Sequence, residues 1–390
     1  MPVEIMSAQE DIISPLEESL LDPRQARSFG DALSLWFKQA ARDLPWRRQR
    51  DGYRALVSEA MLQQTQVDRV TEPFERFMAR FPDVRSLADG SEEDVLALWQ
   101  GLGYYRRARL LHAAAQVIRD QHGGVVPQDA ATLLTLPGVG RYTAGAIASI
   151  VFGERAPIVD GNVARVFARF ATRPGRPGDR DFDAWCWTLA SSVAANVVDP
   201  GVVNEAIMEL GATVCRKHDP DCANCPVRKG CLGHASGEPA SYPEVRVRAT
   251  RTTVHHHVLV CFRTTTSGSA PEVLLVQRPE KGLWARMWQP PSLESKKKLA
   301  CTTVTSRFGL ASDPLDLQRI EHRTTHRDII FHVTRPDVAR MKTFSEADLM
   351  LALGSPESRW HRADRLDELG LSNPHRRMID IAVAEDTEQS

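Results

Sequence analysis

Four cysteines crowded into one short run constrain this chain more than any other feature of its sequence. Cys215, Cys222, Cys225 and Cys231 follow the spacing C-x6-C-x2-C-x5-C, and they are four of the seven cysteines in 390 residues. Four neighbouring thiolates are typical of a tetrahedral zinc site or of an iron–sulfur cluster. Zinc sites usually combine two C-x2-C pairs, whereas this run contains one. The uneven spacing therefore favours a [4Fe-4S] cluster over zinc.

A framework of disulfide bonds is another explanation for clustered cysteines, and the sequence disfavours it. The cysteine count is odd, and the acidic N-terminal segment fits neither a secretory signal nor an arginine-rich transit peptide. Cys186, Cys261 and Cys301 lie apart from the run, and we interpret them as isolated thiols.

The composition is that of a globular protein, and it lacks the excess of positive charge that is typical of many nucleic-acid-binding proteins. Hydrophobic residues make up 42% of the chain and charged residues 25%, and the formal net charge is −1. The longest nearly apolar stretch, residues 144–152, is far too short to span a bilayer. We expect a cytoplasmic protein with no membrane association, in which any DNA-binding surface is a local basic patch.

The pattern of apolar residues changes once along the chain, after Gly233. Up to that point apolar residues recur at helical spacing, and Leu56 to Val70 form one stripe of a predicted helix. Beyond it, short β-rich runs at 257–263, 272–277 and 328–333 precede a predicted helix near 373–384. The expected division is a mobile tail at 1–28, a catalytic part at 29–233, a linker at 234–251, an α+β domain at 252–376 and a second tail at 377–390.

A glycine-rich turn joins two predicted helices within Leu136-Pro-Gly-Val-Gly-Arg-Tyr-Thr-Ala144. Gly138 and Gly140 let the backbone turn tightly and approach a partner closely. The amides that open the second helix then point outward, where they can bind a phosphate. For a lone Gly-Val-Gly a plain αα-hairpin is the better interpretation, but the cysteine run that follows favours DNA.

Several motifs together resemble the helix–hairpin–helix DNA glycosylases of the endonuclease III superfamily, and within it the adenine DNA glycosylases of the MutY type. These motifs are the hairpin, the cysteine run, Asp160-Gly-Asn-Val163, Pro45-Trp-Arg47, Val57-Ser-Glu-Ala-Met-Leu-Gln-Gln-Thr-Gln-Val67 and Gly101-Leu-Gly-Tyr-Tyr105. The resemblance implies an all-α helix–hairpin–helix glycosylase with a [4Fe-4S] loop, followed by an α+β Nudix-like domain. It also implies a monomeric base excision repair enzyme of the bacterial nucleoid, which removes adenine mispaired with 8-oxoguanine or guanine in double-stranded DNA.

Two carboxylates are the candidate catalytic groups, because breaking an N-glycosidic bond calls for an acid and an anion. Glu59 lies beside an apolar stripe of a predicted helix, where partial burial raises a carboxyl pKa. The resemblance assigns to it the protonation of adenine at N7. Asp160 precedes the predicted helix 161–170, where an N-cap is the simpler interpretation, and the resemblance assigns to it the stabilisation of the sugar cation. Tyr142 and Asn162 match residues that position sugar, water or the aspartate.

Lysine usage predicts a glycosylase without efficient AP-lyase activity. Bifunctional relatives form a Schiff base through a lysine at the position of Tyr142, and this chain has no lysine from residue 39 to residue 216. One alternative is an endonuclease III-like lyase for oxidised pyrimidines, which the missing lysine disfavours. Another is an iron–sulfur DNA-binding module that has lost catalysis, which the presence of both carboxylates disfavours.

The resemblance also assigns residues that contact the bases. Flipping a base out of a duplex costs a few kcal/mol and leaves a gap in the stack. Gln64 and Tyr104 match residues that insert beside the orphan 8-oxoguanine. Thr325 and His326 match the recognition loop of the Nudix-like domain, in which Thr324 replaces the aromatic residue of other members. The residues that match the adenine pocket are Arg42, Leu44, Trp46, Arg47 and Glu205.

The C-terminal part lacks the acidic residues that a Nudix hydrolase needs. Such an enzyme holds Mg²⁺ with clustered carboxylates. After Gly282 the chain reads Leu-Trp-Ala-Arg-Met-Trp-Gln-Pro-Pro, with no acidic residue. We therefore expect this domain to recognise a base and not to hydrolyse nucleotides.

Overall fold

The computed structural model describes residues 21–245, 250–263, 270–310, 312–336, 353 and 357–388. The chain divides into two compact units, each built from segments that are far apart in the sequence. The first unit comprises Met1–Glu59 and Val125–Val247, and the second comprises Ala60–Gly124 and Arg248–Ser390. Residues 60–124, which the sequence placed in the catalytic part, thus group with the C-terminal half.

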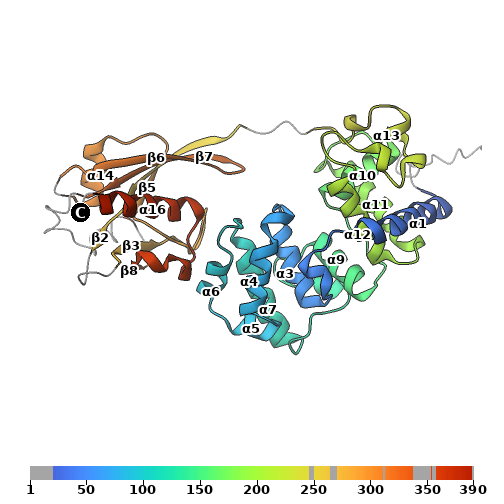
Figure 1. Ribbon diagram of the computed structural model, residues 1–390, viewed down its shortest axis with the longest axis horizontal. Helices are drawn as coiled ribbons and strands as arrows, with labels where there is room; N and C mark the ends of the chain where they lie inside the picture. Colours follow the sequence, from blue (N-terminus) through green and yellow to red (C-terminus); the bar gives the residue numbers. More distant parts are fainter. Residues whose placement is uncertain are drawn as a thin grey trace, which may run out of the picture. The chain divides into compact units, whose positions relative to one another are not determined.

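The first unit is helical (Figure 1). Within the described residues its helices are α1 (Pro23–Ala40), α2 (Pro45–Arg48), most of α3 (Gly52–Leu62), α8 (Ala130–Leu133), α9 (Arg141–Phe152), α10 (Gly161–Ala171), α11 (Arg180–Asn196), α12 (Pro200–Thr213) and α13 (Leu232–Ala235). One core, which includes Phe29, Phe167 and Trp185, joins α1, α10 and α11 with α12.

Helix α1 corrects the expected N-terminal tail. Asp22 caps the helix by accepting hydrogen bonds from the amides of Arg24 and Gln25, and the Gln25 side chain bonds back to the amide of Asp22. This reciprocal capping starts the helix at Pro23. The prediction of a mobile tail was therefore wrong for residues 23–28.

The expected linker also begins too early. Tyr242 packs against the core of the first unit, and its carbonyl oxygen accepts a hydrogen bond from Arg169 at 3.0 Å. The described residues 234–242 therefore belong to the first unit and were wrongly assigned to a linker. No local pattern reveals this packing, because it depends on a partner many residues earlier in the chain.

Helix α3 ends at Leu62, well before the stripe from Leu56 to Val70 is complete, so the prediction of one helix across that stripe was wrong. Gln64 follows with a φ of +56°, in the left-handed region. The physical reason is that the guanidinium of Arg107 binds the carbonyl oxygens of Ala60 and Met61. These carbonyls have no partner within the helix once it ends.

The second unit combines helices and two sheets. Within the described residues its helices are α4 (Thr71–Arg80), α5 (Val84–Asp89), α6 (Glu92–Leu98), α7 (Arg106–Gln121), α14 (Cys301–Phe308) and α16 (Asn373–Glu388). The strands are β1 (Thr252–Leu259), β2 (Phe262–Arg263), β3 (Glu272–Gln277), β4 (Trp288–Gln289), β5 (Ser292–Ser295), β6 (Leu315–Arg323), β7 (Arg327–Arg335) and β8 (Ser358–Arg362).

The strands form one four-stranded sheet in the order β5-β1-β7-β6, and a second in which β2, β4 and β8 all pair with β3. β1 runs parallel to β7, and the other pairs are antiparallel. The expected hairpin across 257–263 and 272–277 is confirmed for β2 and β3. His257 belongs instead to β1 of the other sheet.

Helices cover both faces of these strands. Met378 and Ile379 of α16 pack with Val258 and Phe331 in one core, whereas Val304 of α14 packs with Leu259 in another. The consecutive residues 258 and 259 thus face opposite layers, as in any strand. Because α16 supplies core residues up to Ala382, the prediction of a C-terminal tail from residue 377 was wrong for the part of α16 that the structure describes.

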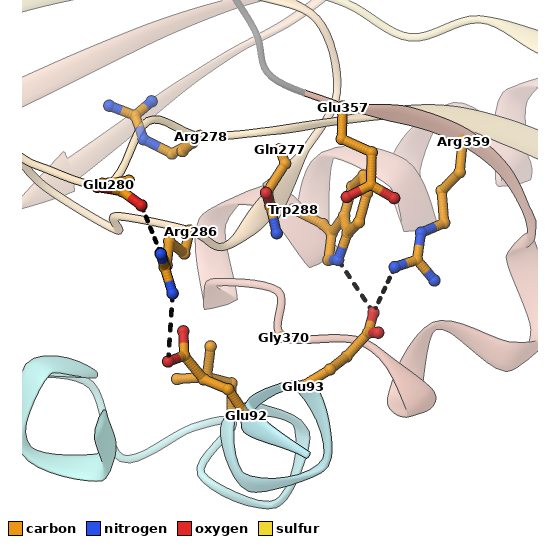
Figure 2. Close-up of a pocket in the computed structure, with 11 residues that line it drawn as sticks. Glu92, Glu93, Gln277, Arg278, Glu280, Arg286, Trp288, Glu357, Arg359 and Gly370 are labelled. Atoms are coloured by element: carbon orange, nitrogen blue, oxygen red, sulfur yellow. Dashed lines mark hydrogen bonds and ion pairs between the residues drawn. The ribbon is translucent and has the colours of Figure 1, made fainter. Parts of the chain in front are cut away.

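A charged pocket of about 400 Å³ lies between α6 and the strands of the second unit (Figure 2). The carboxylate of Glu93 accepts hydrogen bonds from the indole of Trp288 at 3.0 Å and from Arg359 at 2.8 Å. Arg286 lies between Glu92, at 3.6 Å, and Glu280. These ion pairs join the helical segment of the second unit to its sheets.

None of the helices in the described ranges is both long enough and apolar enough to cross a membrane.

Candidate active site

Glu59, Tyr142 and Asp160 come together in the first unit, on α3, on α9 and at the start of α10. Burial raises the pKa of Glu59 to about 7; a hydrogen bond with Tyr142 opposes this shift, and the charges of Asp160 and Glu205 add to it. The expectation that burial raises the pKa of this carboxyl is confirmed. Near neutral pH such a group is populated in both protonation states and can transfer a proton.

Asp160 is the N-cap of α10, as its position in the sequence predicts. Its Oδ1 accepts a hydrogen bond from the amide of Val163 at 2.7 Å, and its Oδ2 accepts one from Nδ2 of Asn162 at 3.1 Å. Burial raises the pKa of Asp160, and the hydrogen bonds from Val163 and Asn162 oppose that shift. The backbone around Asp160 is tightly placed, because a Cβ on Gly145 would lie 2.2 Å from the carbonyl oxygen of Pro157.

Tyr142 lies beside both carboxylates as a neutral phenol. Its hydroxyl donates to Sδ of Met208 at 3.0 Å. Burial, followed by the charges of Glu59 and Asp160, raises its pKa well above the ordinary value. Tyr142 therefore offers this site a hydroxyl group and no amine.

Asn162 links Asp160 to the cysteine loop. Its Oδ1 accepts a hydrogen bond from Nη2 of Arg165 at 2.8 Å, and Nε of Arg165 donates to the carbonyl oxygen of Cys215 at 2.9 Å. The orientation of Asp160 is thus coupled through two side chains to the segment that begins the cysteine run.

Two buried glutamates on α12 organise the predicted adenine pocket. Arg47 donates to Glu205 and to Glu209, at 3.1 Å in each case, and Nε of Arg42 donates to Glu209 at 2.6 Å. Burial raises the pKa of Glu209, but its bonds with Arg42 and Arg47 outweigh burial and lower it. Leu44 is buried beside α2, and Trp46 lies on α2 and is partly buried.

The sequence reasoning missed Glu209 and Arg50. Glu209 follows Glu205 by one helical turn, so the signal was a second carboxylate on the same helical face. Nη1 of Arg50 lies 2.7 Å from Oε2 of Glu205, but this ion pair lacks the angles of a hydrogen bond. Among the described residues no hydrogen-bond donor is therefore aligned with this buried oxygen, which leaves it able to accept from a ligand.

The four cysteines of the run line one pocket of the first unit together with Arg169. Nη1 of Arg169 lies 3.4 Å from Sγ of Cys215 and 2.6 Å from the carbonyl oxygen of Arg216. Across the described ranges, no group of three or more His, Cys, Asp or Glu residues is arranged to hold a metal ion. Four thiols that line one pocket are a ligand set suited to a metal centre with cysteine ligands, either an iron–sulfur cluster or zinc.

The turn at Gly138 and Gly140 has the geometry that the sequence predicts. Gly138 has a φ of +76°, and Gly140 is the N-cap of α9 with no side-chain cap. Both glycines are exposed, and nothing lies within 4 Å of a Cβ placed on Gly140. The first amides of α9 are therefore open to a ligand.

Tyr104 and Thr325 meet in the second unit, although 221 positions separate them in the sequence. Their hydroxyl groups are 3.0 Å apart, and both residues line a pocket of about 490 Å³ that also includes Gln64 and His322. Gln64 and Tyr104 are exposed and have left-handed φ values of +56° and +47°. His326 lies exposed in the turn between β6 and β7, outside the residues that line this pocket.

Comparison with known families finds two matches along the chain. Residues 57–191 match the HhH-GPD superfamily of base excision DNA repair proteins, and residues 266–380 match the NUDIX domain. Together they account for the helical residues around the two carboxylates and for the strands from β3 to β8.

Mammalian proteins are among the curated relatives. The chain is 36% identical to the human adenine DNA glycosylase over 77% of this chain and 64% of that protein, just under two thirds of its length. It is 35% identical to the mouse adenine DNA glycosylase over 80% of this chain and 70% of that protein. Among solved structures, a thermostable thymine-DNA glycosylase is 26% identical, with 53% of this chain and 95% of that chain covered and a TM-score of 0.47.

Proposed function

The chain belongs to the adenine DNA glycosylase family, and from this premise we propose that it excises adenine mispaired with 8-oxoguanine or guanine. The reaction hydrolyses the N-glycosidic bond of a flipped-out deoxyadenosine and leaves an abasic site in duplex DNA. The observation that carries this proposal is the buried pair of Glu59 and Asp160, one of which has a pKa of about 7. Base excision needs an acid for the leaving base and an anion for the sugar.

Glu59 acts in this proposal as the general acid. Burial favours its protonated form, and that form delivers a proton to N7 of adenine, which makes the base a better leaving group. The carboxylate that remains can then accept a proton from the attacking water. Tyr142 lies beside Glu59, and its interaction with the carboxyl opposes part of the pKa rise that burial causes.

Asp160 stabilises the positive charge that develops on the sugar. Its two oxygens are held by Val163 and Asn162, so the carboxylate needs little reorganisation when the oxocarbenium ion forms. The N-cap and the chemical role use the same geometry, because both need a carboxylate fixed at the start of α10.

The adenine edge is read by the buried charges on α12. Oε2 of Glu205 forms an ion pair with Nη1 of Arg50 at 2.7 Å but has no donor with hydrogen-bond angles among the described residues. A carboxylate oxygen can accept from more than one donor, and adenine presents an exocyclic amino group that donates hydrogen bonds. Arg42 and Arg47 hold the glutamates in place through their ion pairs. Leu44 and Trp46 supply the apolar walls of this pocket.

The orphan base is recognised by the second unit. Gln64 and Tyr104 fill the gap beside it, and the hydroxyls of Tyr104 and Thr325 lie close enough together to contact one base. His326 is exposed in the same turn as Thr325, and we propose that it also contacts the DNA. Gly138 and Gly140 offer the amides of α9 to a phosphate.

We further propose that the enzyme has no efficient AP-lyase activity and works as a monomer at the bacterial nucleoid. By the resemblance to bifunctional glycosylases Tyr142 matches the position of their lysine, and its raised pKa leaves it a neutral phenol. Schiff-base formation needs an amine beside the sugar. All residues assigned here come from one chain.

Cys215, Cys222, Cys225 and Cys231 would hold a [4Fe-4S] cluster. When bound, such a cluster supplies a rigid, charged centre that fixes the loop between its ligands. Arg216, Lys217 and Arg228 flank these cysteines in the sequence and are suited to contact DNA phosphates. Arg169 ties the loop to α10 through its hydrogen bonds.

The test is excision from a duplex that holds one A:8-oxoguanine pair, with an A:G duplex beside it and strands resolved with and without hot alkali. We expect cleavage only after alkali, and its loss in Glu59→Gln. Glu154→Gln is the matched control, because Glu154 accepts a structural hydrogen bond from the amide of Ala130 and lies outside the site. Cleavage without alkali would contradict the monofunctional assignment, and absence of base release by the unsubstituted protein would contradict the proposed function.

A further inference from the structure

Arg107 on α7 is a buried cation that binds two separate loops of the second unit. Its side chain is surrounded by protein, with 8% of the residue exposed. The guanidinium donates to six acceptors: the carbonyl oxygens of Ala60 at 2.9 Å, Met61 at 2.8 Å, Gln63 at 2.5 Å, Leu102 at 3.3 Å and Gly103 at 3.1 Å, and Oγ1 of Thr65 at 3.1 Å.

These acceptors flank the two exposed residues that were assigned to the orphan base. Gln63 and Thr65 lie on either side of Gln64, and Gly103 directly precedes Tyr104. Gln64 and Tyr104 both have left-handed φ values, which non-glycine residues adopt only when their surroundings hold them there. The hydrogen bonds of Arg107 hold the peptide groups next to each of these strained positions.

The same side chain also packs against aromatic rings. Cζ of Arg107 lies 5.5 Å from the centre of the Trp99 ring and 5.4 Å from the centre of the Tyr104 ring. Nε1 of Trp99 donates to the carbonyl oxygen of Gly103 at 3.1 Å. Trp99 and Arg107 therefore bind the same peptide group, the one that leads into Tyr104.

We propose that Arg107 is a positioning residue that holds Gln64 and Tyr104 together in the geometry that distinguishes 8-oxoguanine from guanine. This inference rests on the proposed function and deepens it. Arg107 contacts no base; it acts through the two loops. An exposed tyrosine on a flexible loop would sample many orientations. Because hydrogen bonds hold the backbone next to Tyr104, its side chain keeps the orientation in which its hydroxyl contacts Thr325.

Only arginine suits this arrangement. Nη1 donates to Ala60, Met61 and Gln63, and Nη2 donates to Thr65, Leu102 and Gly103. A guanidinium holds these two donor nitrogens in one fixed plane, whereas a lysine ammonium presents three donors from one nitrogen. Burial lowers the pKa of Arg107 to about 10, so the group is still cationic at neutral pH. Arg107→Lys therefore keeps the charge and removes the planar distribution of donors.

The experiment measures single-turnover excision of adenine opposite 8-oxoguanine and opposite guanine, and compares the ratio of the two rates. We expect Arg107→Lys to lower this ratio about tenfold, mainly through the 8-oxoguanine duplex, since several charge-assisted hydrogen bonds are lost. The matched control is Arg155→Lys, because Nη1 of Arg155 also binds carbonyl oxygens, those of Ala194, Ala195 and Val197, at the end of α11. The control should leave the ratio unchanged.

A double-mutant cycle separates positioning from general destabilisation. If Arg107 acts through Gln64 and Tyr104, adding Arg107→Lys to the variant that carries both Gln64→Ala and Tyr104→Ala should leave the ratio of that variant unchanged. Additive losses, or an equal loss in Arg155→Lys, would overturn the proposal. A ratio in Arg107→Lys equal to that of the unsubstituted enzyme would overturn it as well.

Trp99→Phe keeps the proposal testable if Arg107→Lys does not fold. This variant keeps an aromatic ring but removes the N–H that binds Gly103, together with part of the indole. It should lower the same ratio about twofold to threefold, and an unchanged ratio in a folded Trp99→Phe would overturn the proposal. Failure of the proposed function is distinguishable, because the unsubstituted enzyme would then release no adenine. If the enzyme is active and prefers 8-oxoguanine, but the variants keep the same ratio of rates, this inference is wrong and the proposed function still stands.

Discussion

The candidate catalytic residues and the candidate orphan-base residues are held in opposite ways. Glu59 and Asp160 lie on or at the ends of helices in the first unit, where burial raises the pKa of both carboxyls. Gln64 and Tyr104 are exposed on turns of the second unit, with left-handed backbone conformations. Proton transfer needs a group removed from water, whereas recognition needs a side chain that reaches into the DNA. The chain therefore buries the first pair among packed helices, whereas it holds the second pair at the surface by hydrogen bonds to the backbone around it.

The largest expected effect comes from Glu59→Gln. The amide cannot donate the proton that the leaving base needs, so the single-turnover rate should fall about 10³-fold. The fall should be similar opposite 8-oxoguanine and opposite guanine, because the proposed role of Glu59 is on the adenine and not on the orphan base. The measurement is quenched-flow excision on both duplexes, with binding measured separately. A large loss of excision rate on only one of the two duplexes would contradict the proposal that catalysis and orphan-base recognition use separate residues.

Asp160→Asn should lower the rate about 10²-fold without unfolding the protein. Asparagine is as good an N-cap as aspartate, so the hydrogen bond to the amide of Val163 is kept while the negative charge beside the sugar is lost. Thermal unfolding should be nearly unchanged. The matched control is Asp199→Asn, since Asp199 caps α12 by accepting from Val202 at 3.0 Å. An unchanged rate in Asp160→Asn would reduce the role of this residue to capping.

The excision rate should depend on pH through Glu59. Above a pH of about 7 the carboxyl is mostly deprotonated, and the rate should fall about tenfold per pH unit. A rate that stays level up to pH 9 would show that another group supplies the proton.

The titration of Glu59 should also make the free energy of unfolding depend on pH, in a direction that its pKa shift predicts. The native pKa of Glu59 is raised from 4.5 to about 7, so the native state binds more protons than the unfolded state between these values. The stability that protonation of Glu59 contributes is full below pH 4.5 and is lost as the pH rises through about 7. Glu59→Gln should therefore gain stability relative to the unsubstituted protein across this window, as measured by chemical denaturation at several pH values. A stability difference that does not change with pH would contradict the raised pKa.

The smallest effect concerns the contact between Tyr104 and Thr325. Tyr104→Phe and Thr325→Val each remove one hydroxyl of a partly solvated hydrogen bond, so each should lower the preference for 8-oxoguanine about twofold to threefold. Thr325→Ser keeps the hydroxyl and serves as the control. Rates opposite guanine should barely change. If the two substitutions were additive in the double variant, the two hydroxyls would act independently and not as one contact.

The sequence predicted features that depend on local chemistry. Asp160 was predicted as an N-cap and is one, and the apolar stripe beside Glu59 correctly indicated that burial raises its pKa. The change from helical to β-rich composition located the strands β3 and β7. Helix caps, periodicity and turn residues act within a few positions, so a single sequence contains them.

The features that the sequence did not predict depend on contacts between distant residues. Nothing local ends α3 at Leu62, because the donors that cap it belong to Arg107. The meeting of Tyr104 with Thr325 and the grouping of residues 60–124 with the C-terminal half are likewise long-range. Helix α16 continues past residue 377 because Met378 and Ile379 enter a core formed by strands much earlier in the chain.

The most direct test of this division is the ratio of excision rates opposite 8-oxoguanine and opposite guanine, measured side by side in Asp160→Asn and Tyr104→Ala. We predict that Asp160→Asn lowers both rates together and leaves the ratio unchanged, whereas Tyr104→Ala lowers the ratio with little loss opposite guanine. Two results would contradict this account: a changed ratio in Asp160→Asn, or an unchanged ratio in Tyr104→Ala. Either would show that catalysis by the buried carboxylates and recognition by the loops of Gln64 and Tyr104 are not separate.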